Sequence, residues 1–382
     1  MAAKTAAKTA AKTAAKTGAR RQPAKPETKV KAARRGRAAT QPIRWARAEA
    51  TRRPGVTKPI NLALQGGGAH GAFTWGVLDR LLEDGRTFFE GVSGTSAGAF
   101  NAVALAAGLQ AGGAEGARER LEALWRAASN AARLSPLRSS GSSQIAFDLM
   151  TRMISPYQFN PMDLNPLRGL LEDAVDFAAL RRGAPVKLFV AATEVASGRA
   201  RVFETQEISV DVVLASACLP QLHHAVKIGR HHYWDGGFSA NPAILPVIEA
   251  CETPDTLIVQ LNPDHDSELP TRASEITARM MRLTFNQPFR REIETIELCR
   301  RVAREGIAIG GRLRRRVKRH RFHLIEAAPY TKDLKEHSRL TPEWDLLCHL
   351  RDCGRRAAEA WLKKQHRQVG HSSTVDLARK FL

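Results

Sequence analysis

Apolar residues near the start of the folded part of the chain follow two different spacings in turn. Over residues 60–64 they alternate with smaller or polar residues, which predicts a short β-strand, and over residues 73–82 they recur at helical spacing. The same order repeats at once, with a strand expected over residues 88–92 and a helix over residues 99–107 that ends at Gly108. Two strand–helix units in succession favour an α/β fold in which helices cover both faces of a mainly parallel sheet.

Further apolar runs predict that the sheet and its helices continue toward the end of the chain. Short runs of branched apolar residues indicate strands, and longer stretches at helical spacing indicate helices. The expected strands are residues 186–192, 200–203, 257–261 and 322–325, and the expected helices are residues 112–130, 273–306 and 342–365. Residues 134–166 are rich in Ser and Pro and are expected to be irregular, apart from a short apolar island at residues 145–154.

The first 55 residues differ from the rest of the chain in composition. Ala-Ala-Lys-Thr occurs four times between Ala2 and Thr17, and residues 1–55 contain seven Lys and nine Arg but only two Glu, so they carry most of the formal charge of +21. A segment with so little to bury does not fold alone, and we expect residues 1–55 to be a disordered basic tail. Residues 60–250 are expected to form the main domain, and residues 251–382 to complete the sheet and add a helical C-terminal extension.

The composition also bears on where the protein works. Five scattered cysteines show no close-spaced pattern for a metal ion or a disulfide framework, which favours a reduced, cytoplasmic compartment. No run approaches the ~18 apolar residues that cross a bilayer. The N-terminus has no apolar signal core, although its Arg-rich, acid-poor composition also fits an organelle transit peptide.

The sequence Gly94-Thr95-Ser96-Ala97-Gly98 stands between a predicted strand and a predicted helix. A serine in this place occupies a sharp, strained turn that holds its hydroxyl clear of the backbone. The residues two before and two after it pass close to each other, which explains the glycines Gly94 and Gly98. The free N–H groups of a helix N-terminus also favour developing negative charge. Ser96 is therefore a candidate nucleophile, and the alternative is a tight turn with a capping serine.

A second glycine-rich turn, GGGAHG at residues 66–71, follows the first predicted strand. Its spacing fits a dinucleotide-binding fingerprint, which requires an acidic residue ~20 residues further on. That residue would be Glu90, which lies in the strand that leads to the candidate nucleophile. We favour the other interpretation, in which consecutive glycines expose backbone N–H groups that bind an oxyanion. The candidate donors are Gly66, Gly67 and Gly68, and a glycine turn that only packs helix on sheet is the simpler alternative.

The third candidate is Asp235-Gly236-Gly237, which follows two histidines and two aromatic residues. An isolated Asp-Gly pair is ordinarily a turn. A glycine-flanked loop, however, can bring Asp235 to Ser96 from far away in the sequence. The carboxyl group would then be the base that serine needs.

Taken together and in this order, the motifs resemble the patatin-like phospholipase family, in particular a bacterial subgroup with a C-terminal extension. The resemblance covers about residues 60–250. It rests on GGGAHG at residues 66–71, GTSAG at 94–98, ASACLP at 215–220 and DGG at 235–237. It implies a three-layer α/β/α fold, a Ser–Asp dyad in place of a triad, and no metal or cofactor.

Carried over position by position, the resemblance makes Ser96 the nucleophile and Asp235 the general base, with Gly66, Gly67 and Gly68 as oxyanion donors. Where many members of the family have Arg or Lys in the glycine motif, this chain has His70, which puts a fixed cation there in doubt. A partly shielded Asp near its protonated state is able to take the serine proton and return it to the leaving alcohol. A Ser–His arrangement stays as the alternative, with His70, His223, His224, His231 and His232 nearest to the motifs.

These features predict a hydrolase of lipid carboxyl esters, of the phospholipase A or lysophospholipase kind, that meets its substrate from the water side of a membrane or granule. The alternatives are hydrolysis of a storage polyester and a non-catalytic scaffold that tethers nucleic acid or granules through its tail. The basic tail is expected to contact nucleic acid or anionic membrane. The island at residues 145–154 is a candidate lid at the acyl-chain entrance, or else an ordinary core helix.

Overall fold

The computed structural model describes residues 57–134, 154–265, 269–305, 311–334 and 336–382, all within one compact unit that spans residues 41–382. The expected tail, residues 1–55, and nearly all of the apolar island, residues 145–153, lie outside the described residues. None of the described helices is both long and apolar enough to span a bilayer.

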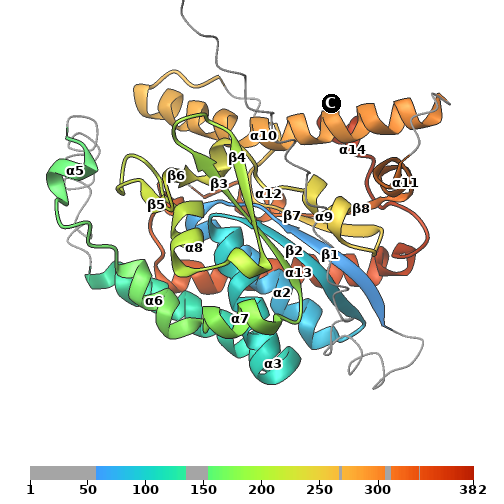
Figure 1. Ribbon diagram of the computed structural model, residues 1–382, viewed down its shortest axis with the longest axis horizontal. Coiled ribbons are helices and arrows are strands. Elements are labelled where there is room, and N and C mark those ends of the chain that lie inside the picture. Colours follow the sequence, from blue (N-terminus) through green and yellow to red (C-terminus); the bar gives the residue numbers. More distant parts are fainter. Residues whose placement is uncertain (1–56, 135–153, 266–268, 306–310, 335) are drawn as a thin grey trace, which may run out of the picture. The chain divides into compact units, whose positions relative to one another are not determined.

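Eight strands form one sheet in the order β5-β6-β3-β2-β1-β7-β8, with β4 paired to β3 beside this path (Figure 1). The pairs β1–β2, β1–β7, β2–β3 and β7–β8 are parallel, and the three pairs that involve β4, β5 and β6 are antiparallel. The strands are β1 Lys58–Leu64, β2 Thr87–Thr95, β3 Lys187–Glu194, β4 Ala200–Glu204, β5 Val226–Ile228, β6 His231–Asp235, β7 Asp255–Gln260 and β8 Arg321–Glu326. The predicted strands are therefore confirmed, whereas β5 and β6 were not expected.

Helices cover both faces of this sheet. The α-helices are α2 Gly71–Asp84, α3 Ala97–Leu134, α5 Pro156–Phe159, α6 Pro166–Ala174, α7 Phe177–Gly183, α8 Val210–Ser216, α9 Leu245–Ala250, α10 Ala273–Arg304, α11 Arg312–Arg319, α12 Ala328–Thr331, α13 Trp344–Lys364 and α14 Leu377–Phe381. The 3-10 turns are η1 Gly68–His70, η2 Thr205–Glu207, η3 Gly236–Phe238, η4 Glu336–Arg339 and η5 His366–Gln368.

Two buried clusters hold the helix layers to the sheet. The larger one joins α2, α3 and α13 to one face, and the smaller one joins α9, α10, α11 and α14 to the other (Figure 1). Burial of apolar surface on both faces explains why the central strands are continuous apolar runs. The described part of the chain is thus a three-layer α/β/α structure, as predicted.

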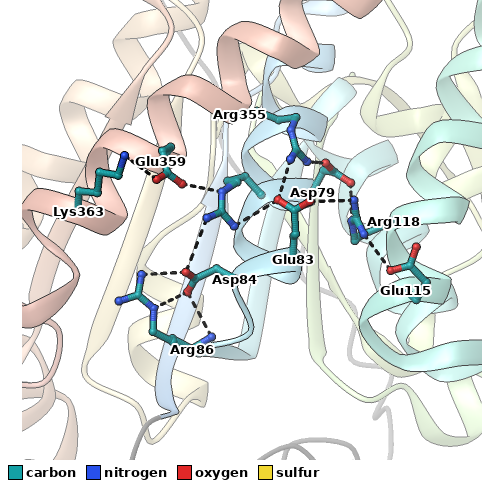
Figure 2. A network of polar contacts seen from close by, with 10 residues as sticks. Asp79, Glu83, Asp84, Arg86, Glu115, Arg118, Arg355, Glu359 and Lys363 are labelled. Carbon is teal, nitrogen blue, oxygen red and sulfur yellow. Dashed lines mark hydrogen bonds and ion pairs between the residues drawn. The ribbon is translucent and has the colours of Figure 1, made fainter.

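Helix α13, in the C-terminal region, packs closely against α2. The two helices approach at a pair of glycines: a Cβ on Gly76 would overlap the carbonyl of Arg351, and one on Gly354 would overlap the carbonyl of Phe73. A network of ion pairs at the edge of this contact links α2, α3 and α13 (Figure 2). In it, Arg118 Nε lies 2.8 Å from Asp79 Oδ1, and Arg355 also pairs with Asp79. This part of the C-terminal region is therefore built into the main fold.

The first predicted helix boundary after the nucleophile is wrong. We expected a helix to end at Gly108, but α3 continues past it and turns at Gly112 and Gly113, where φ is −150° and 65°. Gly108 packs against the helical segment that follows this turn, since a Cβ on Gly108 would overlap Ala117. Glycine at this position serves the close packing of two helical segments and not a helix end.

Candidate active site

Ser96 lies in the turn between β2 and α3, at the carboxyl end of the parallel strands. Its φ of 54° is left-handed, which is uncommon for a residue other than glycine and marks a strained turn. Thr95 and Ala97 on either side are buried, whereas Ser96 is partly exposed. A Cβ on Gly94 would lie 2.6 Å from the carbonyl carbon of Gly98, which confirms the predicted close approach of the two glycines. The turn therefore presents the Ser96 side chain as expected of a nucleophile elbow.

The turn is held from the other side by Ser216, which is buried at the end of α8. The Ser96 N–H donates a hydrogen bond of 2.9 Å to the Ser216 hydroxyl. Ser216 belongs to the ASACLP segment, residues 215–220, so this part of the sequence directly supports the strained backbone of Ser96.

Asp235 is the last residue of β6, and its side chain is buried, with 1% of the residue exposed. The prediction of an Asp on a glycine-flanked loop is therefore corrected: the residue ends a strand that pairs with β3 opposite Ala192. The Gly237 N–H donates a hydrogen bond of 2.7 Å to Asp235 Oδ1. A Cβ on Gly236 would overlap the carbonyl of Ala191, and one on Gly237 would overlap the ring of Phe285, so both positions leave no room for a side chain.

The Asp235 carboxyl accepts a hydrogen bond from the Ser96 hydroxyl. Complete burial raises its pKa from 3.8 to about 7, although hydrogen bonds from Gly237 and from the Ser96 hydroxyl pull the pKa down. A carboxyl group with a pKa near neutrality can both accept and return a proton at physiological pH. The structure thus brings together the two predicted residues, which stand far apart in the sequence.

The glycine loop after β1 lies directly against the nucleophile turn. A Cβ on Gly66 would lie 2.8 Å from the Thr95 carbonyl oxygen and 2.9 Å from Ser96 Cβ. The Gly66 N–H donates a hydrogen bond of 2.7 Å to Asn241 Oδ1, so this amide already has a partner. Gly68 adopts a left-handed φ of 60° and begins η1. Of the three candidate oxyanion donors, the structure therefore leaves Gly67 and Gly68 as the ones not used by Asn241.

The sequence of residues 62–248 matches the family model for patatin-like phospholipase. These residues are a patatin-like phospholipase domain. Proteins of this family are typically lipid acyl hydrolases. Among solved structures, the chain is similar to VipD from Legionella pneumophila, with 16% sequence identity and a TM-score of 0.34, over 78% of this chain and 67% of that one. No curated protein matches the chain.

In this patatin-like domain, His70 of the glycine motif is a buried, neutral side chain. Burial, together with the nearby positive charge of Arg339, lowers its pKa to about 3. Its Nε2 shares a hydrogen bond of 2.7 Å with the Ser338 hydroxyl. His70 therefore supplies no positive charge to the glycine loop, and it ties that loop to the turn η4.

A positive charge reaches the glycine loop from outside the patatin-like domain. Arg339 Nη1 donates a hydrogen bond of 2.6 Å to Asn262 Oδ1, and the same nitrogen lies 3.2 Å from where a Cβ on Gly67 would stand. A Cβ on Gly68 would overlap the Arg339 carbonyl. Arg339 thus covers the loop that carries the remaining candidate donors.

The histidines that were weighed as bases have other partners. His70 contacts Ser338, His224 Nε2 lies 3.1 Å from the Pro156 carbonyl oxygen, and His231 pairs with Glu194. His232 is exposed, and burial lowers the pKa of His223. The geometry favours the carboxyl group of Asp235 over an imidazole as the partner of Ser96.

Three residues of the site were not assigned a role from the sequence: Ser216, Asn241 and Arg339. Ser216 lies within the ASACLP motif, and Asn241 closely follows the Asp-Gly-Gly sequence. Both residues could therefore have been found from their position in the sequence. Arg339 stands in a segment with no motif, and only its position in space connects it with the site.

Proposed function

We propose that this protein hydrolyses carboxyl esters of lipids, in the manner of a phospholipase A or lysophospholipase, with Ser96 as nucleophile and Asp235 as general base. The observation that carries the proposal is the buried Asp235 carboxyl, with a pKa near 7, in hydrogen-bonding reach of a serine that stands in a strained left-handed turn. Separate elements hold the two groups: Ser96 lies between β2 and α3, and Asp235 ends β6.

In the first step Asp235 takes the proton of the Ser96 hydroxyl while Oγ attacks the ester carbonyl carbon, and the carbonyl oxygen becomes an oxyanion. When the tetrahedral intermediate collapses, the alcohol leaves with the proton held by Asp235, and the acyl group stays on Ser96. In the second half of the reaction Asp235 takes a proton from water while the water oxygen attacks the acyl carbon; the bond between that carbon and Ser96 Oγ then breaks, and Oγ recovers the proton from Asp235. The product is a free carboxylic acid.

The oxyanion would be bound by the backbone N–H groups of Gly67 and Gly68, with Arg339 adding a positive charge beside them. Donors fixed in advance stabilise charge that develops in the transition state, and loss of one donor typically costs ~10²–10³ in rate. Gly66 supports this arrangement in another way, since its amide is bound to Asn241.

A fluorophosphonate probe and a p-nitrophenyl ester test the proposal. We expect the probe to label the wild-type protein and not the Ser96→Ala variant, and both Ser96→Ala and Asp235→Asn to lose at least ~10³ of the esterase rate. Ser197→Ala, at an exposed serine, and Asp211→Asn, at a partly exposed aspartate, serve as controls. Labelling that persists in Ser96→Ala would exclude the proposed nucleophile.

The substrate class and the tail require their own measurements. A panel of phospholipid, lysophospholipid and storage polyester distinguishes the lipid substrate from the polymer. We propose that residues 1–55 act as an electrostatic anchor, because they carry a large excess of Lys and Arg. Their deletion should weaken salt-sensitive binding to DNA or to anionic vesicles. Unchanged binding to both surfaces would exclude the anchor.

A further inference from the structure

Six of the exposed large apolar side chains in the described residues lie in two segments, one on and just after α5 and one at the start of α10. The side chains are 55% exposed at Tyr157, 78% at Met162 and 67% at Leu164 in the first segment, and 42% at Ile276, 63% at Met280 and 52% at Leu283 in the second. Single exposed apolar residues are normal on a protein surface, but contiguous groups mark interaction sites. We name these six residues the apolar rim.

The start of α10 is largely exposed in the part of the chain that the structure describes. Ile276, Met280 and Leu283 are spaced by four and three residues, so they lie along one face of the helix. The first buried residue of α10 is Phe289, and residues 271–277 are all exposed. Up to Phe289, therefore, this helix buries no residue fully against the rest of the described protein.

This part of α10 joins the active site directly. The ring of Phe285 lies 4.8 Å from that of Phe238 and fills the space that a side chain on Gly237 would need. The Phe285 carbonyl accepts a hydrogen bond of 3.2 Å from Asn241 Nδ2. Phe285, on the face of α10 opposite to Ile276, Met280 and Leu283, thus connects this part of the helix to the segment that holds Asp235.

The α5 segment is connected to the same site by a chain of contacts. The ring of Tyr157 stacks on that of His224 at 4.0 Å. The His224 carbonyl accepts a hydrogen bond of 3.0 Å from Cys218 Sγ, and the Cys218 carbonyl accepts one of 2.8 Å from the Asp235 N–H. Tyr157 is therefore linked to Asp235 through His224 and Cys218, as α10 is through Phe285.

We propose that the apolar rim is the surface with which the protein binds the face of a lipid aggregate, such as a phospholipid bilayer. This inference rests on the proposed function, since a lipid ester in an aggregate reaches Ser96 only where the mouth of the site meets the lipid. Net charge supports it: the segment from Arg272 to Arg291 contains five Arg and a single acid, Glu275. Apolar side chains that enter the acyl region, flanked by arginines at the level of the phosphates, are typical of interfacial helices.

The basic helix α11 does not belong to this surface. It carries six Arg or Lys in eight residues, but it leads into the amino end of β8, whereas Ser96 follows the carboxyl end of β2. Helix α11 therefore lies at the amino ends of the parallel strands, whereas the site lies at their carboxyl ends. Binding through the apolar rim is expected to depend on apolar contact and to occur on zwitterionic vesicles in high salt, where a purely electrostatic patch fails.

The test measures sedimentation of the full chain with phosphatidylcholine vesicles in about 0.5 M salt. Salt at this concentration screens interactions between surface charges. All binding variants are made in Ser96→Ala protein, so that turnover cannot alter the vesicles. We expect Met280→Glu with Leu283→Glu to lower the partition coefficient at least tenfold, and Met162→Glu with Leu164→Glu to lower it similarly. Leu298→Glu is the matched control, because Leu298 is 50% exposed near the other end of the same helix.

In protein with Ser96 intact, the rim variants should lower the ratio of vesicle hydrolysis to soluble-ester hydrolysis at least tenfold. Equal partition coefficients for the rim variants and Leu298→Glu would overturn the proposal. So would a wild-type dimer that the rim variants dissociate, because the rim would then bind a second copy of the chain. Failure of the proposed function is a separate result, namely no hydrolysis of soluble ester by wild-type protein that does bind vesicles.

Discussion

Asn241 holds the glycine loop through Gly66: its Oδ1 accepts a hydrogen bond of 2.7 Å from the Gly66 N–H. Asn241 stands six residues after Asp235, whereas Gly66 directly precedes the candidate oxyanion donors. One side chain therefore couples the position of the base segment to that of the donors, and its other end is fixed by the Phe285 carbonyl.

Replacing this side chain should disturb the loop and not the binding of a soluble ester. For Asn241→Ala we expect kcat to fall ~10- to 100-fold with little change in KM, because the donors would no longer be held where the oxyanion forms. Loss of the partner of a buried N–H should also cost about 1–3 kcal/mol of stability. Esterase kinetics and urea denaturation measure both effects. Asn286→Ala on α10, which removes a hydrogen bond to the Pro263 carbonyl, is the control.

The pKa of Asp235 predicts the pH dependence of hydrolysis. The base must be ionised, and burial raises its pKa to about 7. Between pH 6 and pH 8 the ionised fraction rises about tenfold, so kcat/KM for a neutral soluble ester should rise by about the same factor. A profile that is flat from pH 5 to pH 8 would contradict the assignment of Asp235 as the base.

The same burial predicts a cost in stability. The folded protein binds the Asp235 proton more tightly than the unfolded chain does, so its contribution is greatest at low pH and is lost as pH rises from about 4 to about 7. Glu292, whose pKa burial raises to about 7 while it accepts the N–H groups of Ile244 and Leu245, acts in the same direction. We expect inactive Asp235→Asn to be about 1–3 kcal/mol more stable than wild type at pH 8, with a smaller difference at pH 5. Urea denaturation at the two pH values measures this, and equal differences would argue against the shifted carboxyl.

Arg339 offers a test of the positive charge beside the glycine loop. We expect Arg339→Ala to lower kcat about tenfold, and Arg339→Lys to recover part of the loss, because Lys keeps the charge but not the planar donor group. Arg367→Ala removes an exposed arginine remote from the site and should leave kcat unchanged. Identical kcat values for all three variants and the wild type would show that the charge has no role.

The contact between α2 and α13 predicts a stability effect without a catalytic one. A methyl group at Gly354 would overlap the Phe73 carbonyl. Gly354→Ala should therefore lower the free energy of unfolding by about 2 kcal/mol or more, since the helices must separate. Gly169→Ala on α6 is the matched control, because a Cβ there meets no atom within 4 Å, and it should be neutral or slightly stabilising. If Gly354→Ala were as stable as the control, the close contact between α13 and α2 in the structure would be contradicted.

The sequence by itself determined the local features of this protein. The alternation in residues 60–64, the helical spacing that follows and the glycines around Ser96 depend on contacts between neighbours in the chain, so β1, α2 and the strained turn were predictable. Strands β5 and β6 were missed because runs of three and five residues are too short to show a clear alternation. Gly108 was taken for a helix end because a glycine in a close helix contact looks the same in sequence.

Only the tertiary structure decided which groups meet. The Gly66 amide is bound because Asn241 is packed beside it, and Arg339 covers the loop because η4 lies against η1. The raised pKa of Asp235 likewise comes from burial by segments remote in sequence. Such contacts are set by the packing of whole helices on the sheet, and no short stretch of sequence encodes them.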